Sequence, residues 1–351
     1  MKVVMDEKIP YLQDALSGMG VEVVALPGVA IGQGDVADAD ALFVRTRTLC
    51  NKELLEGSRV KFIGTATIGH DHIDASYCSA NGIVWRNAAG CNACAVLQYV
   101  QSVVYLWSME RGVSLHNLAI GVVGVGEIGS RVAAWAESVG MRVLRNDPPK
   151  AEGVADGYVS LERVAAECDI ISFHPSLVKV GKNPSFHLAD EAFFASLKRC
   201  SLFINASRGP VVDNAALLSY MYLNPSMAVV LDVWEGEPEI NTSLLEKTFI
   251  STPHIAGYSA EGKINATRIV LEAFVSFFGY EGDVPQLSLP LPVNPDVLAS
   301  TEQEALLSIY SPMGDSRELR KNPALFEDLR NNYNLRREPS AYNIRIRRSE
   351  N

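Results

Sequence analysis

The chain has 351 residues, of which 48% are hydrophobic and 21% charged, and its formal net charge is −10. The length predicts two or three domains, and the balanced composition excludes a disordered or collagen-like chain. The negative charge disfavours nucleic acid or an anionic membrane as the main partner. The longest apolar runs fall short of the roughly 20 residues that a membrane helix needs, and the first residues lack the apolar core of a secretory signal. A cytoplasmic protein is therefore expected.

Short apolar segments alternate with helical segments over the first ninety residues. The predicted β-strands are residues 2–5, 21–26, 41–44, 60–63 and 82–85. Helices are predicted between them, at residues 10–19, 51–56 and 72–79. This alternation predicts a mainly parallel sheet with helices on its faces.

A long helix, residues 92–110, leads into a second set of the same kind. Its predicted strands are residues 118–123, 142–145, 170–173, 202–205, 228–231 and 249–251. A second long helix is predicted at 259–280, and it could pack back on the first sheet. The fold class expected is α/β, with two doubly wound parallel-sheet (Rossmann-like) domains, one of them discontinuous in sequence.

The pattern changes after residue 281. The segment VPQLSLPLPVNP is rich in proline and predicts an extended linker. Residues 317–351 hold nine basic and five acidic side chains, a local charge of +4 in a chain of −10. This tail is thus a separate piece in charge as well as in position.

The cysteines do not predict a metal site. Six are scattered along the chain, and most are expected to be reduced and packed. Cys91 and Cys94 form a CxxC without a second pair, so they are interpreted as the first turn of a helix rather than as zinc ligands. A metal site near His70-Asp71-His72 is a distant alternative.

A glycine-rich motif follows the first strand of the second set. In LAIGVVGVGEIG, Gly124 permits a tight turn, Gly126 lets the backbone approach a pyrophosphate, and Gly129 lets the next helix lie close to the strand. The helix-start amides of Glu127 and Ile128 would then face the diphosphate. A glycine-rich turn without a ligand is the alternative interpretation.

The context of this motif favours a dinucleotide. Asp147 lies 18 residues past Gly129, at the end of the next predicted strand, where an acid can accept hydrogen bonds from a ribose 2′-hydroxyl. No arginine follows it that would accommodate a 2′-phosphate. The predicted cofactor is therefore NAD rather than NADP.

Three charged side chains follow later strands, where α/β folds place their ligands. They are Arg208 in NASRGPVVDN, Glu237 in DVWEGEPE and His254 in TPHIAGY. Oxidation of an alcohol needs a base, which histidine supplies near neutral pH, and a carboxylate fixes its tautomer. An arginine fork binds a carboxylate. These three are the predicted catalytic residues.

Each of the three also has a structural alternative. Arg208 could pair with Asp213 or Asp232. Glu239 could replace Glu237 as the partner of the histidine, and His254 could be a helix cap. The three together, in this order on a nucleotide-binding unit, are more specific than any of them alone.

The glycine loop, Asp147 and the segments SRGPVVDN, DVWEGEPE and TPHIAGYS resemble the D-isomer-specific 2-hydroxyacid dehydrogenases. The resemblance extends over nearly the whole chain and includes FVRTRT, KFIGTATIGHDHID and the tail segment FEDLRNNYNLRRE. It implies an NAD-dependent enzyme that oxidises a small phosphorylated 2-hydroxy acid, with His254 as acid/base. It also implies NAD contacts, which are Asp147, Ala206, Ser207, Arg208, Asp232 and Gly257.

The resemblance implies substrate contacts at Thr46, Thr67 and Tyr258. Arg45 and Arg47 are further candidates for attracting a substrate phosphate, with solvated strand-end charge as the alternative. Thr46 stands where serine is expected, which keeps a hydroxyl. Pro175 stands at a usual cofactor contact but offers neither a hydroxyl nor an N–H, so it is not counted as a site residue.

The same resemblance divides the chain into domains. Residues 1–92 and 256–282 would form a substrate-binding domain, 93–255 an NAD-binding Rossmann domain, and 283–351 a small C-terminal α+β domain that forms a homodimer. Two other functions stay open. One is a sister enzyme acting on 3-phosphoglycerate or an unphosphorylated 2-hydroxy acid, and the other is a non-catalytic NAD-sensing protein.

Overall fold

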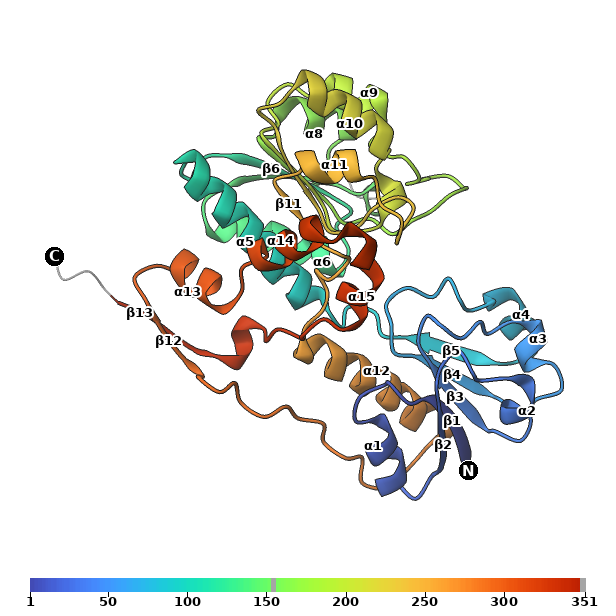
Figure 1. Ribbon diagram of the computed structural model, residues 1–351. Helices are drawn as coiled ribbons and strands as arrows, with labels where there is room; N and C mark the ends of the chain where they lie inside the picture. Colours follow the sequence, from blue (N-terminus) through green and yellow to red (C-terminus); the bar gives the residue numbers. More distant parts are fainter. Residues whose placement is uncertain (153–155, 348–351) are drawn as a thin grey trace. The chain divides into compact units, whose positions relative to one another are not determined.

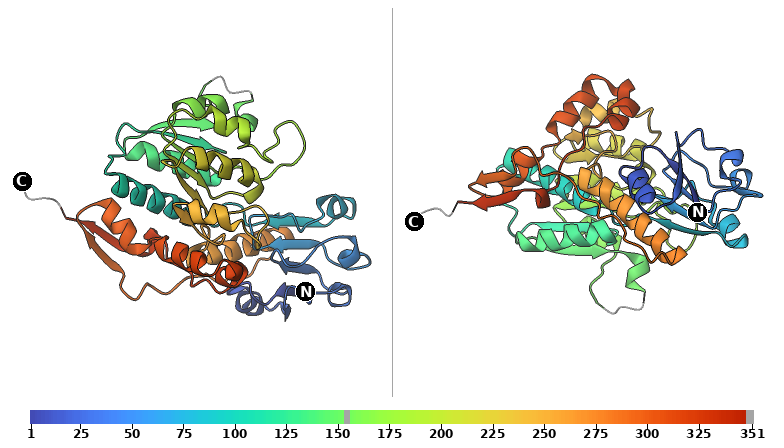
Figure 2. Two further views of the ribbon diagram at one scale, coloured as in Figure 1. Left: turned by 45° about the horizontal axis from the view of Figure 1, so that its top comes forward. Right: turned by 90° about the horizontal axis from the view of Figure 1, so that it is seen from below.

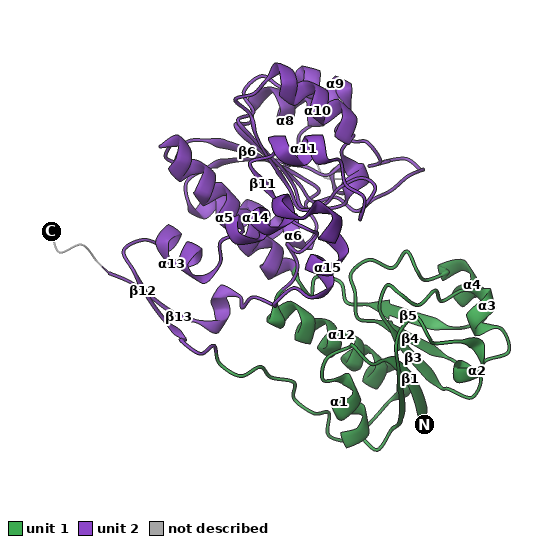
Figure 3. Cartoon of the chain, viewed as in Figure 1, with its two compact units in different colours: residues 1–92, 259–291 green, residues 93–258, 292–351 purple. Residues whose placement is uncertain are grey.

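The computed structural model describes residues 1–152 and 156–347. The chain forms two compact units, which Figure 3 colours separately. Unit 1 comprises Met1–Asn92 and Ser259–Leu291, and unit 2 comprises Ala93–Tyr258 and Pro292–Asn351. Unit 1 is therefore discontinuous in sequence.

Unit 1 is built on a five-stranded parallel sheet in the order β2-β1-β3-β4-β5. Its strands are β1 (Lys2–Asp6), β2 (Glu22–Leu26), β3 (Ala41–Val44), β4 (Phe62–Thr65) and β5 (Val84–Asn87). Its helices are α1 (Leu12–Gly18), α2 (Gln33–Val36), α3 (Lys52–Leu55), α4 (Ala75–Ala80) and α12 (Ala260–Phe278). Phe274 of α12 packs against Phe43 and Phe62 of the sheet. The expectation that the second long helix packs on the first sheet is confirmed.

Unit 2 contains a six-stranded parallel sheet in the order β11-β10-β9-β8-β6-β7. Its strands are β6 (Ala119–Val123), β7 (Arg142–Asn146), β8 (Ile170–Phe173), β9 (Leu202–Asn205), β10 (Ala228–Leu231) and β11 (Ile250–Ser251). Its helices up to this point are α5 (Ala93–Arg111), α6 (Glu127–Ser138), α7 (Pro148–Ala151), α8 (Leu161–Glu167), α9 (Glu191–Ser196), α10 (Asn214–Leu223) and α11 (Thr242–Lys247).

Successive side chains of these strands enter two different cores, because side chains alternate across a strand. Ile120 and Val122 pack with α5 and α6, whereas Ala119 and Val123 pack on the side of α8, α9 and α10. Figures 1 and 2 show these two helical layers on opposite faces of the sheet. Strands covered on both faces are predominantly apolar, as is usual in parallel sheets. The predicted fold class, α/β with two Rossmann-like parallel sheets, is confirmed.

All pairings in the unit 2 sheet are parallel, so the carboxyl ends of its strands share one edge. The segments that follow β6, β7, β9, β10 and β11 therefore start at this edge. They carry Gly124, Asp147, Arg208, Asp232 and His254 in turn. Open α/β sheets bind their ligands at this edge.

The C-terminal segment adds strands β12 (Asp296–Ala299) and β13 (Asn343–Ile346), which pair in parallel, and helices α13 (Glu302–Ile309), α14 (Met313–Lys321) and α15 (Phe326–Asn331). Leu319 and Phe326 are fully buried in the core of unit 2. Residues 292–347 thus combine a small sheet with helices, and they pack into the same compact unit as the six-stranded sheet.

Two predicted strands of the first unit are displaced by two residues. Residues 60–63 and 82–85 were expected, and the strands are Phe62–Thr65 and Val84–Asn87. Val60 and Ile83 are buried in a core of unit 1 although they precede the ladder. The apolar pattern therefore begins before the hydrogen-bonded strand does. In the described residues, none of the helices is both long and apolar enough to cross a membrane.

Candidate active site

The glycine loop connects β6 to α6 in the geometry of a dinucleotide cradle. Gly124 has a φ of 83°, and a Cβ at this position would lie 2.5 Å from the backbone nitrogen of Pro175. A Cβ on Gly129 would lie 2.0 Å from the carbonyl oxygen of Gly124. At Gly126, by contrast, an added Cβ would meet no described atom within 4 Å. Gly124 and Gly129 thus permit close packing of the loop against Pro175 and of the helix against the loop. Gly126 leaves open space in front of the first residues of the helix.

Helix α6 begins at Glu127, followed by Ile128, and the N-cap position is Gly126. Within the described chain no side chain caps this end. Free backbone amides and the helix dipole make such an end favourable for an anion. The predicted contribution of Glu127 and Ile128 is therefore compatible with a bound diphosphate.

A cavity of about 390 Å³ adjoins this loop, entirely within unit 2. It is lined by Gly124, Gly126, Asp147, Pro148 and His174, among others. One oxygen of the Asp147 carboxylate accepts a hydrogen bond from Val125 N at 2.8 Å, and the other accepts from Lys150 N at 3.2 Å. The residues present fit a dinucleotide: an open glycine turn, an uncapped helix end and a carboxylate at the next strand.

His174 was not among the predicted site residues. Its side chain is buried, and its Nδ1 has no hydrogen-bond partner in the described chain, whereas Nε2 lies 2.8 Å from Ser172 Oγ. Burial lowers the pKa of this imidazole to about 3, so the ring is neutral. An unpartnered buried nitrogen beside the cavity is a further sign that a ligand belongs there.

The segment after β9 holds Arg208 through a side-chain network. Asn205 accepts hydrogen bonds from the backbone N and the hydroxyl of Ser207, at 3.1 and 2.8 Å, and donates to the carbonyl of Arg208. The guanidinium of Arg208 itself donates to Ser207 O at 2.8 Å. Ala206 and Ser207 are buried, and Arg208 is half-buried.

Gly209 brings this segment against the one that follows β10. A Cβ at Gly209 would lie 1.9 Å from the carbonyl oxygen of Trp234. Only glycine permits this approach of the two backbones. The Arg208 segment therefore packs directly on the segment that leads to Glu237.

Glu237 and His254 are in direct contact. Oε2 of Glu237 lies 2.8 Å from Nδ1 of His254, and Oε1 accepts a hydrogen bond from Trp234 N at 2.8 Å. Burial would raise the pKa of the Glu237 carboxyl, but the contact with His254, the Trp234 amide and the Arg330 charge lower it overall. Glu239, the alternative partner, is exposed. The carboxylate fixes the histidine tautomer and leaves Nε2 as an acceptor.

Asp232 supports the segment that carries His254. Its carboxylate is buried and accepts hydrogen bonds from Thr252 Oγ1 at 2.7 Å, Ile255 N at 2.8 Å and Ala256 N at 3.0 Å. Burial raises its pKa, although the His254 charge and these hydrogen bonds oppose the shift. Both carboxylate oxygens are thus engaged by the chain, and a contact of Asp232 with NAD stays a prediction.

The other predicted substrate contacts are divided between the units. In unit 1, Thr46 is exposed, and the Thr67 hydroxyl donates to Gly69 O at 2.8 Å. Arg45 forms an ion pair with the fully buried Asp6, Nε to Oδ2, at 2.9 Å. In unit 2, Gly257 and Tyr258 are half-buried and follow His254 directly. The catalytic, cofactor and substrate roles of all these residues stay predictions.

Two arginines from the C-terminal segment also reach the His254 segment, and the sequence analysis did not identify either. Arg336 is buried and donates to the carbonyls of Ile255 at 2.9 Å and Tyr258 at 3.0 Å, and also to that of Ala256. Arg330 donates from Nε to Tyr258 Oη at 3.3 Å. The likeness of FEDLRNNYNLRRE to relatives was the available signal, but it pointed to the tail as a whole.

Comparisons with known proteins identify the family of the chain. Residues 95–256 match the D-isomer specific 2-hydroxyacid dehydrogenase, NAD binding domain family. Over 98% of this chain and 99% of the relative, the sequence is 50% identical to erythronate-4-phosphate dehydrogenase of Bacteroides thetaiotaomicron. It is 43% identical to the protein of the same name from Shigella flexneri, over 97% of this chain and 93% of the relative.

Solved structures of related enzymes have the same fold. The cofactor-bound 3-phosphoglycerate dehydrogenase of Entamoeba histolytica is similar with a TM-score of 0.66 and 25% identity, covering 81% of this chain and 97% of that one. D-Lactate dehydrogenase of Aquifex aeolicus, complexed with NAD and lactic acid, has a TM-score of 0.61 and 26% identity, covering 80% and 96%.

The fold, the glycine loop and these matches define an NAD-dependent oxidoreductase, and the chain belongs to the D-isomer specific 2-hydroxyacid dehydrogenase family. Within that family, the relatives that it matches over nearly its whole length include erythronate-4-phosphate dehydrogenases at 43–50% identity.

Proposed function

We propose that this enzyme oxidises 4-phospho-D-erythronate to (R)-3-hydroxy-2-oxo-4-phosphooxybutanoate with NAD, a step of pyridoxal 5′-phosphate (vitamin B6) biosynthesis. The observation that carries a hydroxy-acid oxidation is the contact between His254 Nδ1 and Glu237 Oε2 at 2.8 Å. The choice of this hydroxy acid is supported by the relatives of 43–50% identity over nearly the whole chain.

In this proposal His254 is the general base. Because Glu237 accepts a hydrogen bond from Nδ1–H, the lone pair is on Nε2, which takes the proton of the C2 hydroxyl. The imidazolium formed is stabilised by the Glu237 carboxylate, whose pKa is already lowered by this contact. In the reverse direction the same imidazolium returns the proton to the C2 oxygen.

Arg208 binds the C1 carboxylate and polarises the C2 oxygen. Its backbone is fixed by Asn205 and by the close packing of Gly209 on Trp234. A planar guanidinium suits a carboxylate because it donates two parallel hydrogen bonds. NAD, when bound, supplies the acceptor for the C2 hydride.

NAD would be held by three parts of unit 2. The amides of Glu127 and Ile128 and the open face of Gly126 support binding of the diphosphate. The Asp147 carboxylate, which lines the cavity, would accept a hydrogen bond from a ribose hydroxyl. Thr46, Thr67 and Tyr258 remain the proposed substrate contacts.

A substrate panel tests this function. The formation of NADH is followed with 4-phospho-D-erythronate, 3-phosphoglycerate and D-lactate side by side. We expect a kcat/KM for 4-phospho-D-erythronate on the order of 10²-fold above the others, as pockets that discriminate by size and polar contacts achieve. A preference for 3-phosphoglycerate would show that the chain is instead the sister enzyme that oxidises this acid. NAD binding without turnover of any hydroxy acid would indicate a sensing protein.

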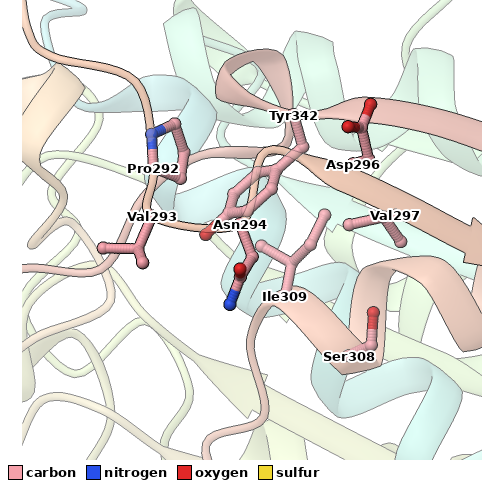
Figure 4. Close-up of a pocket in the computed structure, with 8 residues that line it drawn as sticks. All are labelled: Pro292, Val293, Asn294, Asp296, Val297, Ser308, Ile309 and Tyr342. Carbon is pink, nitrogen blue, oxygen red and sulfur yellow. The ribbon is translucent and has the colours of Figure 1, made fainter.

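We also propose that the enzyme is a homodimer that associates through its C-terminal residues, 283–351. Apolar side chains on the small sheet and in the segment before it support this proposal because they face solvent. Leu298, Ile344 and Ile346 of the sheet are exposed, and Val293, before β12, is 97% exposed. Beside them is a hollow of about 380 Å³, lined by Val293, Val297, Ile309 and Tyr342 among others (Figure 4). Exposed apolar patches of this kind mark contact surfaces.

Sedimentation measurements test the dimer. Wild-type protein at micromolar concentration is expected to have twice the chain mass of 38.2 kDa. Leu298→Asp is expected to shift it toward the monomer, whereas Val180→Asp, at an exposed apolar residue of unit 2 outside the small sheet, is expected to leave it a dimer. A monomeric wild type would contradict the proposal.

The division into a substrate-binding domain (1–92 and 256–282), an NAD-binding domain (93–255) and a C-terminal domain (283–351) is likewise proposed. The two compact units support the discontinuous first domain. A cytoplasmic location is also proposed, and the buried thiols of Cys50, Cys78 and Cys168, typical of a reducing compartment, support it.

A further inference from the structure

The C-terminal segment places a cationic side chain beside the proposed catalytic pair. Arg330 lies in α15, is half-buried, and donates from Nε to Tyr258 Oη at 3.3 Å. Tyr258 follows His254 by four residues. Among the described residues, the two terminal nitrogens of Arg330 have no hydrogen-bond or ion-pair partner in the protein. They are available to a ligand.

The positive charge of Arg330 lies close enough to Glu237 for each group to shift the pKa of the other. Burial would lower the pKa of its guanidinium, but the phenol of Tyr258 and the carboxylates of Glu237 and Glu327 raise it overall. The Arg330 charge in turn helps to lower the pKa of Glu237. Arg330 therefore acts electrostatically on the Glu237–His254 pair without being neutralised by an ion pair of its own.

The segment that carries Arg330 is held firmly in unit 2. Phe326, one turn earlier in α15, is fully buried. Arg336, six residues later, donates to the carbonyls of Ile255, Ala256 and Tyr258. On its other side Arg336 donates to Ala95 O and to Gln98 Oε1 of α5. Buried contacts on both sides of Arg330 in the chain thus hold its segment, and Arg336 holds the backbone of Tyr258. The position of the Arg330 guanidinium is therefore preorganised.

Two of the other candidate cations are already engaged. Arg208 is assigned to the C1 carboxylate. Arg45 gives its Nε and one terminal nitrogen to the buried Asp6 carboxylate, at 2.9 and 3.4 Å. A guanidinium with two uncommitted nitrogens matches the oxygens of a phosphate, which it binds in a bidentate way.

We propose that Arg330 binds the phosphate group of the substrate together with the Tyr258 hydroxyl, and so makes the enzyme specific for a phosphorylated hydroxy acid. This inference rests on the proposed function. It explains what the C-terminal tail contributes to the chemistry of unit 2. No step of the reaction changes, because Arg330 binds a group remote from the C2 hydroxyl.

The test compares Arg330→Gln and Arg330→Lys with wild type on 4-phospho-D-erythronate and on unphosphorylated D-erythronate. Arg330→Gln is expected to raise KM for the phosphorylated acid on the order of 10²-fold, since a charged hydrogen-bonding group is lost. Its kcat is expected to change by less than about threefold, because binding is lost equally in ground and transition states. On D-erythronate, kcat/KM is expected to change by less than about threefold, because this acid lacks the phosphate and only the electrostatic effect of Arg330 on Glu237 is lost. Arg330→Lys keeps the charge but not the planar fork of donors. Its KM for the phosphorylated acid is expected to lie between those of wild type and Arg330→Gln.

Lys321→Gln is the matched control, because it removes one positive charge from the neighbouring helix α14 at an exposed ion pair with Glu318. It is expected to behave as wild type. The affinity for NAD, measured by quenching of tryptophan fluorescence, is expected to be unchanged in every variant and confirms folding. Inorganic phosphate is a second probe: it should compete with the substrate in wild type and lose this effect in Arg330→Gln.

Two results would overturn the proposal. An unchanged KM for the phosphorylated acid in Arg330→Gln would remove Arg330 from substrate binding while leaving the proposed function intact. An equal loss of kcat/KM on both acids would show that Arg330 has a structural role and does not bind the phosphate. If wild type turns over only unphosphorylated acids, the proposed function fails, and the phosphate site fails with it.

Discussion

His254 is held in an unusual backbone conformation opposite Glu237, with 2.8 Å between Nδ1 and Oε2 and a φ of 57° at His254. Non-glycine residues seldom adopt this left-handed region, and they do so where surrounding contacts impose it. Here Asp232 imposes it, because it accepts the amides of Ile255 and Ala256 and its own carbonyl accepts the amide of His254 at 2.7 Å. The buried carboxylate of Asp232 thus fixes the backbone of the proposed base, and the half-buried carboxylate of Glu237 fixes its ring.

Replacement of His254 by asparagine should abolish the base while keeping the fold. Asparagine tolerates a positive φ better than alanine does, so His254→Asn is the cleaner variant. We expect kcat to fall by about 10²–10⁴-fold, the usual contribution of a general base. Unfolding in urea should change little. Near-normal turnover in steady-state assays of this variant would refute the role of His254.

Glu237→Gln should separate the orientation of the His254 ring from the stabilisation of its protonated form. An amide can still accept a hydrogen bond from Nδ1, but it does not stabilise the imidazolium and can impose the wrong tautomer. We expect kcat to fall on the order of 10²-fold or more, with KM for NAD unchanged. Glu239→Gln is the matched control, because Glu239 is exposed, and it should keep wild-type kinetics. Equal losses in the two variants would argue against a specific role for Glu237.

Much of this arrangement could be predicted from the sequence because its elements are local and strongly patterned. Strands β8, β9 and β10 are buried along their whole length, and apolar segments with polar ends predict their bounds. Glu237 and His254 each follow a strand, and parallel strands bring their carboxyl ends to one edge. Their proximity is thus a consequence of topology that the sequence already contains.

The remaining features depend on contacts between distant parts of the chain. Arg336 bonds to Ala95 O across 241 residues, and a basic tail residue is indistinguishable in sequence from a solvated charge. Strand β13 alternates polar and apolar residues, but it is exposed along its length, and this pattern does not reveal that it pairs with β12. Arg45 was interpreted as a candidate for a phosphate, yet its ion pair with the buried Asp6 could be seen only once β1 and β3 were adjacent.

Arg336→Met should measure how strongly the tail is tied to unit 2. The substitution leaves carbonyls of Ile255, Ala256 and Tyr258 without a donor in a buried place. Loss of a buried charged group with such partners costs about 3–5 kcal/mol of the free energy of unfolding. Arg345→Met, at an exposed position of β13, should stay within about 0.5 kcal/mol of wild type in urea denaturation. A loss below about 1 kcal/mol in Arg336→Met would mean that the tail is bound by other contacts.

His174 gives the stability a defined dependence on pH. Its pKa in the folded protein, about 3 because of burial, lies below the ordinary value of 6.5. The unfolded chain therefore takes up a proton below pH 6.5 while the folded protein does not, and protonation favours unfolding. The contribution of this group to stability is complete above pH 6.5 and declines as the pH falls toward 3.

At pH 5 this decline amounts to about 2 kcal/mol for the single imidazole, at 1.36 kcal/mol per unit below the ordinary pKa. In His174→Gln, the free energy of unfolding should therefore drop between pH 7 and pH 5 by about 2 kcal/mol less than in wild type. Its value at pH 7 should be lower, because the ring fills a buried place beside Ser172. His116→Gln, at an exposed histidine, should keep the wild-type difference between the two pH values. Equal differences in His174→Gln and wild type, measured by urea denaturation, would show that the ring is protonated in the folded protein or that it is accessible to water.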